Sequence, residues 1–253
     1  MMPEIEEAFQ LATKVLLGVS LQGIQLHGEW LYENHRKLTT TKSAISGKPI
    51  SNPPMLFYRL ISLRAVKFDE WPEIGKHSIP AEETKGIALS SAKKIIEPIR
   101  YYTPESVLGQ NIAVEECSHY IDSSYCYKVN SFVSCKYCAY SFWPRDSEYL
   151  FGVDTVFSSR FCLKCYSSSN LTRCFEVANS TNCSDSYFCY NCDALDNCMF
   201  CFNTKSKRHA IGNVEYPREQ YLRIKKLLLD EIARKIEKEK RLSLSIFNVG
   251  CQK

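Results

Sequence analysis

The residues in this sequence best suited to chemistry are four Cys-x-x-Cys pairs. Two thiolates separated by two residues can occupy one edge of a tetrahedral zinc site, and two such pairs are typical of a zinc centre. Three of the pairs recur at a spacing of twenty-seven positions, so stacked coils of a repeat protein would bring four thiols close to one ion. The candidate zinc ligands are therefore Cys135, Cys138, Cys162, Cys165, Cys189 and Cys192, and a fourth pair is formed by Cys198 and Cys201.

The placement of all the cysteines favours packing over metal binding. Twelve of the 13 lie between Cys117 and Cys201, and each of their numbers leaves a remainder of zero or three on division by nine. Where cysteine is absent from these two columns, residues such as Val, Leu, Pro or Ser replace it, which a core tolerates and a strict metal ligand does not. The preferred prediction is a core of reduced cysteines without a cofactor, and a zinc-thiolate protein is the alternative.

This nine-residue repeat predicts the fold. A short unit that cannot bury its own apolar face must stack on its neighbours, which indicates a β-solenoid. We predict a mainly β chain with a cysteine-laddered solenoid over residues 108–206 and about twenty-seven residues per coil. A coil of eighteen residues is the alternative, but only the longer coil places cysteine on cysteine in three successive coils. Ser and Asn suit the corners, because their side chains can bond the local backbone.

Helical regions are expected on both sides of the solenoid. Residues 1–107 are predicted to form a helical or mixed region that begins with a helix from Pro3 to Gly18, where apolar residues recur at helical spacing. The segment 33–55 ends in two prolines and predicts an extended arm that orders on binding, whereas 56–68 fits strand or helix. Residues 207–253 should form an amphipathic helix that covers the open end of the solenoid, followed by a basic tail.

The sequence lacks the motifs of common catalytic sites. It contains no glycine-rich phosphate-binding motif and no thioredoxin-like context for a redox pair. Its five histidines have no nucleophile or carboxylate at motif spacing: His27, His35, His77, His119 and His209. We therefore predict that the protein is not an enzyme and has no catalytic residues.

The segment from Cys174 to Asn213 resembles uncharacterised cysteine-rich tandem-repeat proteins encoded in prokaryotic and viral genomes. The similarity lies in its Cys-Phe, Ser-x-x-Cys and Asn-Cys phrases, in Cys-Met-Phe-Cys-Phe-Asn, and in the helix start Tyr-Pro-Arg-Glu-Gln-Tyr. It covers about the last half of the chain. The resemblance implies no established activity, and it favours a structural or assembly role that includes a virion component.

These observations predict a structural or interaction protein that presents a rigid solenoid to protein partners in a homo- or hetero-oligomeric assembly. A basic nucleic-acid-binding module is the second alternative, because residues 205–253 hold 13 Lys and Arg against 6 Asp and Glu. The acidic start of the chain does not fit a signal peptide, and no apolar run approaches the ~20 residues of a membrane span. We expect a cytoplasmic or virion location and no membrane contact.

Overall fold

A computed structural model describes residues 2–249 of the chain, which divide into two compact units. The solenoid unit contains residues 2–37 and 109–249, and the insert unit contains residues 38–108. The predicted start of the solenoid at residue 108 is close to this division. The predicted N-terminal region 1–107, however, is split, because its first helix packs on the solenoid and contributes to the same core.

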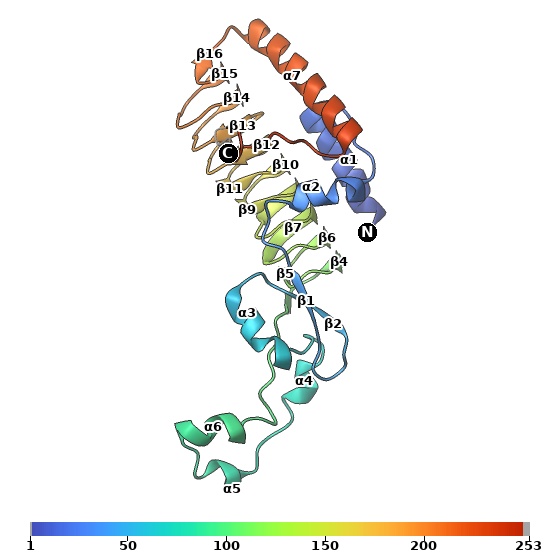
Figure 1. Cartoon of the computed structure of the whole chain (residues 1–253), viewed down its shortest axis with the longest axis vertical. Coiled ribbons are helices and arrows are strands. Elements are labelled where there is room, and N and C mark those ends of the chain that lie inside the picture. The colour runs from blue at the N-terminus through green and yellow to red at the C-terminus, as the bar shows by residue number, and fades with distance from the viewer. Residues whose placement is uncertain (1, 250–253) are drawn as a thin grey trace. The chain divides into compact units, whose positions relative to one another are not determined.

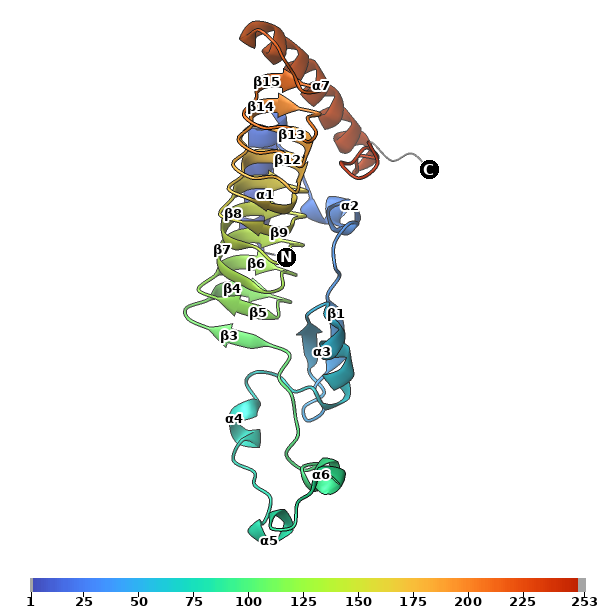
Figure 2. The same cartoon turned by 90° about the vertical axis from the view of Figure 1, so that its left-hand side faces the viewer.

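The predicted mainly β fold with a β-solenoid and flanking helices is confirmed (Figures 1 and 2). Successive strands are parallel, and each residue pairs with the one twelve positions later, as in Cys162 with Cys174 and Cys198 with Ala210. The coil strands are β4 (Ile112–Glu115), β5 (His119–Ile121), β6 (Ser124–Tyr127), β7 (Phe132–Ala139), β8 (Arg145–Phe151), β9 (Asp154–Phe157), β10 (Arg160–Leu163), β11 (Tyr166–Ser169), β12 (Thr172–Ala178), β13 (Tyr187–Tyr190), β14 (Asp196–Met199) and β15 (Arg208–Ile211).

The predicted coil lengths, twenty-seven residues and the alternative of eighteen, are both wrong, because the coil closes after twelve and the solenoid makes about nine turns. Along most of the coil, every third residue has a left-handed backbone with φ between 46° and 56°, and the following residue points inward. Each left-handed residue turns the chain through a corner, so four triplets complete one coil. The nine-residue repeat is three triplets, and three such repeats make two coils plus one further side.

Residues at the corners match the sequence prediction in part. Asn and Ser occupy many of the left-handed positions, among them Asn170, Asn182 and Ser206, but Tyr, Phe and Lys occupy others. A left-handed conformation costs a non-glycine residue roughly 1–2 kcal/mol, and Asn tolerates it best. The repeated hydrogen bonds between coils must offset this cost in every turn.

Helix α1 (Pro3–Leu17) covers one outer side of the solenoid, and its predicted existence is confirmed. It buries Ile5, Phe9 and Leu16 against an outward row of side chains that recur once per coil, so that Phe9 lies 5.3 Å from Phe151 between ring centroids. The rest of that row is Ala139, Leu163, Phe175, Tyr187 and Met199. Because α1 fills the outer core of the solenoid unit, this unit has two apolar layers, one inside the coil and one outside it.

The predicted C-terminal helix is confirmed as α7 (Arg218–Glu239), which follows Pro217 and buries Tyr221, Ile232 and Ile236. It runs back along the side of the solenoid toward α1 instead of lying across the open end (Figures 1 and 2). Within residues 2–249, none of the helices combines the length and the apolar character that a membrane span requires.

The open end of the last coil is closed by a hairpin and one side chain. Strand β16 (Val214–Glu215) pairs antiparallel with β15, and Asn213 at the turn mimics the next coil. Its Oδ1 accepts a hydrogen bond from the backbone N–H of Phe202 (2.9 Å), and its Nδ2 donates to the carbonyl of the same residue (2.8 Å). The side-chain amide thus replaces the peptide groups that a tenth turn would supply, which protects the edge from pairing with other chains.

We expect Asn213→Gly to lower the free energy of unfolding by about 1–2 kcal/mol, because both polar groups of Phe202 lose their partner at an exposed edge. Glycine accepts the φ of 67° at this position, so the loss reports the cap and not backbone strain. Urea unfolding followed by circular dichroism measures the change. Asn213→Asp retains only the acceptor, so its free energy of unfolding should lie between those of the wild type and Asn213→Gly. Equal stability of all three proteins would show that Asn213 does not cap the last coil.

The insert unit has little secondary structure and a small core. The predicted extended arm at 33–55 is corrected in this unit, because β1 (Thr39–Lys42) and β2 (Pro49–Asn52) form an antiparallel hairpin whose backbone groups satisfy each other. The segment 56–68, whose sequence fits strand or helix, forms α3 (Leu56–Ile61) and the short 3₁₀ helix η2 (Ser62–Arg64). The remaining elements are α4 (Trp71–Ile74), α5 (Ala81–Thr84), α6 (Leu89–Ile95) and β3 (Ser106–Leu108).

Candidate functional site

The predicted zinc ligands do not stack on one another. The two cysteines of a pair occupy neighbouring sides of the coil, and successive pairs of the predicted set are displaced by one further side. The cysteines that do lie above one another are partners in the parallel register of adjacent coils, as Cys126 and Cys138 are. The predicted stack of Cys135, Cys138, Cys162, Cys165, Cys189 and Cys192 is therefore not formed, because it depended on the longer coil.

The twelve cysteines from Cys117 to Cys201 are all buried and unpaired by disulfides. Their thiols donate to the carbonyl two residues earlier, as in Cys183 to Thr181 (3.1 Å), and inward serines do the same, as in Ser159 to Phe157 (2.7 Å). The inner positions thus suit small side chains with a hydrogen-bond donor. Burial raises the pKa of Cys117 and of Cys183 to about 12, which keeps both as neutral thiols.

Three thiols meet near the last coils. Those of Cys189 and Cys198 hydrogen-bond with that of Cys201, which lowers the pKa of Cys201 and raises the pKa values of its two neighbours. Across residues 2–249, no group of three or more His, Cys, Asp or Glu side chains is arranged to hold a metal ion. Cys251 is outside the described residues.

We expect chelation to leave the fold intact. Treatment of purified protein with EDTA or phenanthroline should shift the melting temperature by less than about 2 °C, because close-packed Cys, Val and Leu side chains fill the solenoid core. Circular dichroism melts before and after chelation, with zinc measured by mass spectrometry, test this. One equivalent of zinc whose removal unfolds the protein would restore the zinc-thiolate alternative.

The most unusual polar group is a buried cluster that the sequence reasoning missed. Lys164 is fully buried, and its Nζ donates to the carbonyl of Trp30 (2.9 Å) and to the carboxylate of Glu33. Its Nζ also lies 3.7 Å from Oε1 of Glu176, which is fully buried one coil further on. We call Glu33, Lys164 and Glu176 the charge latch. The only signal in the sequence is the spacing of one coil between Lys164 and Glu176, and this spacing predicts a contact only once the coil length is known.

The charge latch joins three parts of the solenoid unit. Glu33 follows α2 (Gly28–Tyr32), Lys164 and Glu176 belong to the coils, and Oε2 of Glu176 accepts a hydrogen bond from the backbone N–H of Ile246 (2.9 Å) in the C-terminal tail. Desolvation raises the pKa of Glu176 to about 7, against an ordinary 4.5. The latch therefore fastens the N-terminal segment and the tail to the same side of the solenoid.

A lysine next to carboxylates can act as a base or a nucleophile, but this arrangement does not present it to a substrate. A pocket of about 400 Å³ opens beside the latch and is lined by Trp30, Glu33 and Arg241, among others, whereas Lys164 is not in its lining. The Lys164 ammonium is held by a carbonyl and a carboxylate beneath this surface. The geometry indicates a structural function for the latch.

The five histidines occupy separate places in the structure. His35 lies against the rings of Tyr32 and Tyr166, at 5.7 and 5.9 Å between centroids, and burial lowers its pKa to about 4. His27 is buried beside the carbonyl of Lys240, with 3.0 Å between Nδ1 and the oxygen. His209 packs on Tyr221, His77 lines a pocket of the insert unit, and His119 lies in β5.

The side of the solenoid that the helices leave open carries a polar ladder, defined as Asn179, Asn191, Asn203, Thr181 and Asp193. The side-chain amide of Asn179 donates to Oδ1 of Asn191 (3.4 Å), and that of Asn191 donates to Oδ1 of Asn203 (2.8 Å). Thr181 donates to Asp193 (2.8 Å). These exposed side chains repeat at the coil spacing. The ladder stabilises the stacking of the coils and makes a regular, flat, polar surface.

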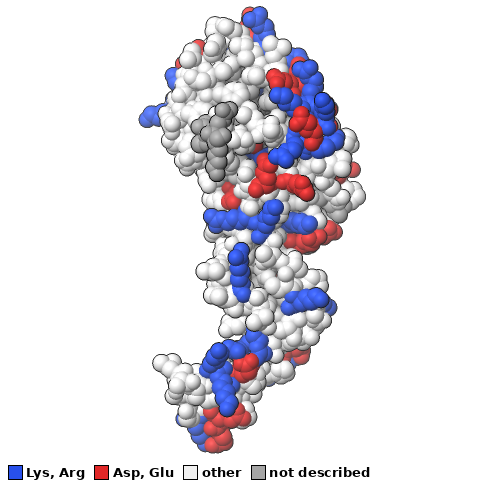
Figure 3. Space-filling view, viewed as in Figure 1, with Lys and Arg blue, Asp and Glu red and all other residues white. Residues whose placement is uncertain are grey.

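The basic C-terminal region, the basis of the nucleic-acid alternative, does not present a surface of one sign. Figure 3 shows Lys and Arg interleaved with Asp and Glu along α7. Lys226 pairs with Asp230 and Lys235 with Glu231, each at 2.7 Å. This alternation is typical of a solvated helix, and residues 250–253 of the predicted tail are outside the described part of the chain.

Neither a comparison with models of protein families nor one with curated proteins found a match for this chain.

Proposed function

We propose that this protein is a non-enzymatic structural or interaction protein, in which the solenoid unit is a rigid support and the insert unit binds a protein partner. The observation that carries the proposal is the distribution of exposed apolar side chains. Of the 19 large apolar side chains exposed among the described residues, ten belong to the insert unit, which covers only residues 38–108.

The insert unit also has too few buried side chains for a stable core of its own. Its buried apolar residues are Ile50, Ala65, Val66 and Ile74. Small units bury a low fraction of their surface and depend on staples or partners for stability, and contiguous exposed apolar surface marks interaction sites in soluble proteins. An apolar surface that a partner covers accounts for both features.

The solenoid unit supports the same proposal in a different way. Its coil interior is filled by Cys, Val and Leu side chains from four sides, and its outer apolar row is covered by α1. A body stacked in this way deforms little. It would hold the insert unit in an assembly of several chains, and the resemblance of the second half to repeat proteins of viral genomes extends the proposal to virions.

The native particle tests the proposed function. The tagged full chain, expressed at its natural level, is cross-linked in its own cells and purified, and the mass of the product is compared with the 29.1 kDa of one chain. We expect the chain in stoichiometric complexes with defined protein subunits. A particle that contains one chain and no other protein would overturn the proposal.

A further inference from the structure

We propose that the partner of the insert unit is a second copy of this chain, bound through the exposed side of α3. This inference rests on the proposed function and names its partner. Four side chains carry it: Leu56, Phe57, Leu60 and Leu63 are 72%, 52%, 76% and 89% exposed. We call these four residues the α3 stripe.

The α3 stripe is one continuous surface. Leu56, Phe57 and Leu60 belong to α3, and Leu63 belongs to the adjoining η2. At roughly 100° per residue in α3 and 120° in η2, the four side chains fall within about 120° of the helix circumference, the width of a core-facing stripe. Tyr58, Ile61 and Ser62 lie on the opposite side and are half-buried against the rest of the unit. The helix therefore turns its more apolar side away from its own unit, which is the reverse of what an isolated domain requires.

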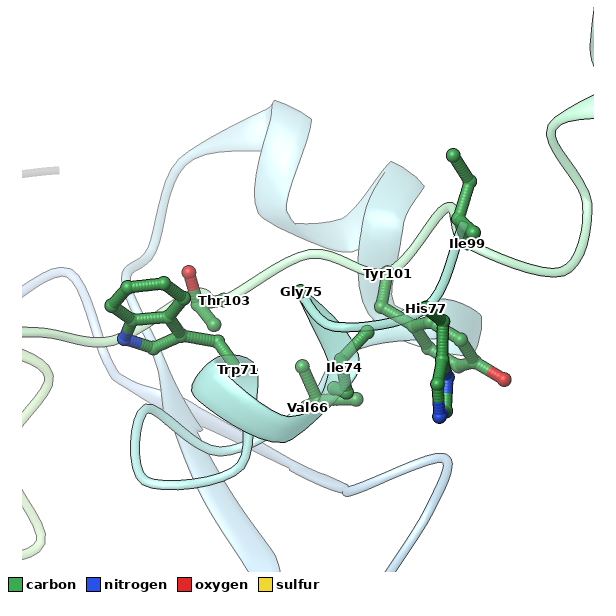
Figure 4. A pocket seen from close by; sticks show the side chains of 8 residues that line it. All are labelled: Val66, Trp71, Ile74, Gly75, His77, Ile99, Tyr101 and Thr103. Atoms are coloured by element: carbon green, nitrogen blue, oxygen red, sulfur yellow. The ribbon is translucent and has the colours of Figure 1, made fainter. Parts of the chain in front are cut away.

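The insert unit has a second apolar surface. A pocket of about 370 Å³ is lined by Val66, Ile74, Ile99 and Tyr101, with Trp71 at one side and His77 at the other (Figure 4). Trp71 is half exposed. Aromatic side chains next to a shallow apolar pocket are typical of the side chains that dominate protein interfaces.

The area of the stripe meets the lower limit for a specific dimer. Its four side chains expose roughly 500 Å², so two copies would bury about 1,000 Å² in total, the smallest area expected of a specific interface. Homodimer interfaces are also more apolar than others. Within α3 the only charged residue is Arg59, at the edge of the stripe, so two copies can pair in a two-fold arrangement without burying a charge.

A lipid surface is the less suitable occupant. Helices that lie in a membrane interface are usually longer than the six residues of α3 and carry several basic residues on the polar side. Here Arg64 pairs with Glu97 within the unit, which leaves Arg59 as the cation of the helix. The solenoid unit of the same chain and an unrelated protein are the other possible occupants, and the experiment separates them.

The test measures the mass of the full chain by sedimentation velocity between 1 and 100 µM. We expect a dimer of twice 29.1 kDa, and Leu60→Glu should weaken dimerisation at least 100-fold, because it places a charge at the centre of the stripe. The control Leu227→Glu changes a leucine of α7 that is 66% exposed, and it should dimerise as the wild type does. Circular dichroism of Leu60→Glu should match the wild type, since this side chain is exposed in one copy.

A cross-link tests the same arrangement by the formation of a covalent dimer instead of the loss of one. The twelve cysteines of the coil are buried, so Leu60→Cys in a Cys251→Ser background adds one accessible thiol. Under mild copper-phenanthroline oxidation, two such thiols across the two-fold axis would lose their protons and two electrons to the oxidant and form one disulfide. We expect a covalent dimer, and none with Leu227→Cys in the same background.

Several results would overturn the inference, and they differ in what they leave standing. A wild type that is monomeric at 100 µM, with a melting temperature that Leu60→Glu lowers, would assign the stripe to the solenoid unit of the same chain. Co-sedimentation of the monomer with phosphatidylserine vesicles, lost in Leu60→Glu, would assign it to lipid. A monomer that forms native complexes only with another protein would contradict the dimer and support the proposed function. A chain found alone in its own cells would contradict both.

Discussion

Replacement of Lys164 by Met should lower the free energy of unfolding by about 3–5 kcal/mol, the cost of leaving a buried charge without its partner. Glu176 is fully buried and would keep only the N–H of Ile246, and the carbonyl of Trp30 would lose its donor. Methionine matches the length of the lysine stem, so little packing is lost. Urea unfolding at pH 8, above the pKa of about 7 that Glu176 has in the wild type, measures the change.

Two further variants show whether charge is the cause. Lys164→Met combined with Glu176→Gln removes both charges and keeps an oxygen for the N–H of Ile246, so it should regain at least half of the lost stability. Lys136→Met changes an exposed lysine of the same solenoid and should shift stability by less than about 0.5 kcal/mol. If Lys164→Met stays within about 1 kcal/mol of the wild type, the charge latch contributes no more than a surface pair.

The second large effect is a pH dependence of the free energy of unfolding, in which two opposite contributions cancel in the wild type. The pKa of Glu176 is raised from 4.5 to about 7 by desolvation, so the folded protein binds more protons than the unfolded chain between these values. Its contribution of about 3 kcal/mol is complete below pH 4.5 and is lost as the pH rises through 7. The groups that face it are Lys164, Glu33 and Tyr166.

His35 acts in the opposite direction in almost the same range. Burial lowers its pKa from 6.5 to about 4, so its contribution, also about 3 kcal/mol, is complete above pH 6.5 and is lost as the pH falls through 4. Lys164 is the charged group that faces it. Between pH 4.5 and 6.5 the two slopes oppose each other, and the wild type should change little on their account.

Single variants should separate the two slopes. Between pH 4.5 and 7, Glu176→Gln should not show the loss of about 3 kcal/mol that Glu176 causes in the wild type. The difference in the free energy of unfolding, variant minus wild type, should therefore grow by about 3 kcal/mol over this range. In His35→Phe, which keeps a ring against Tyr32 and Tyr166, it should fall relative to the wild type by a similar amount from pH 4 to 6.5. Urea unfolding at half-unit pH steps gives these difference curves, and two flat ones would contradict the assigned burial of both groups.

Much of the architecture could be predicted from the order of residues. Cysteines confined to two columns of a nine-residue repeat identify inward positions, and inward positions at a constant spacing require a solenoid. The two terminal helices were predicted because α1 and α7 carry their apolar stripes, and because Pro3, Gly18 and Pro217 mark ends by local backbone chemistry alone. These features depend on residues close together in the chain.

The coil length could not be predicted in the same way, and the candidate sites depended on it. A period of three is compatible with a coil of twelve, eighteen or twenty-seven residues, and only the hydrogen bonds between turns select the shortest. That choice disperses the six predicted zinc ligands over different sides and brings Lys164 next to Glu176. The sequence by itself therefore determined which side chains face inward, because that follows from a short repeat along the chain. The tertiary structure decided which of these side chains meet, because contacts between turns join residues about a whole coil apart.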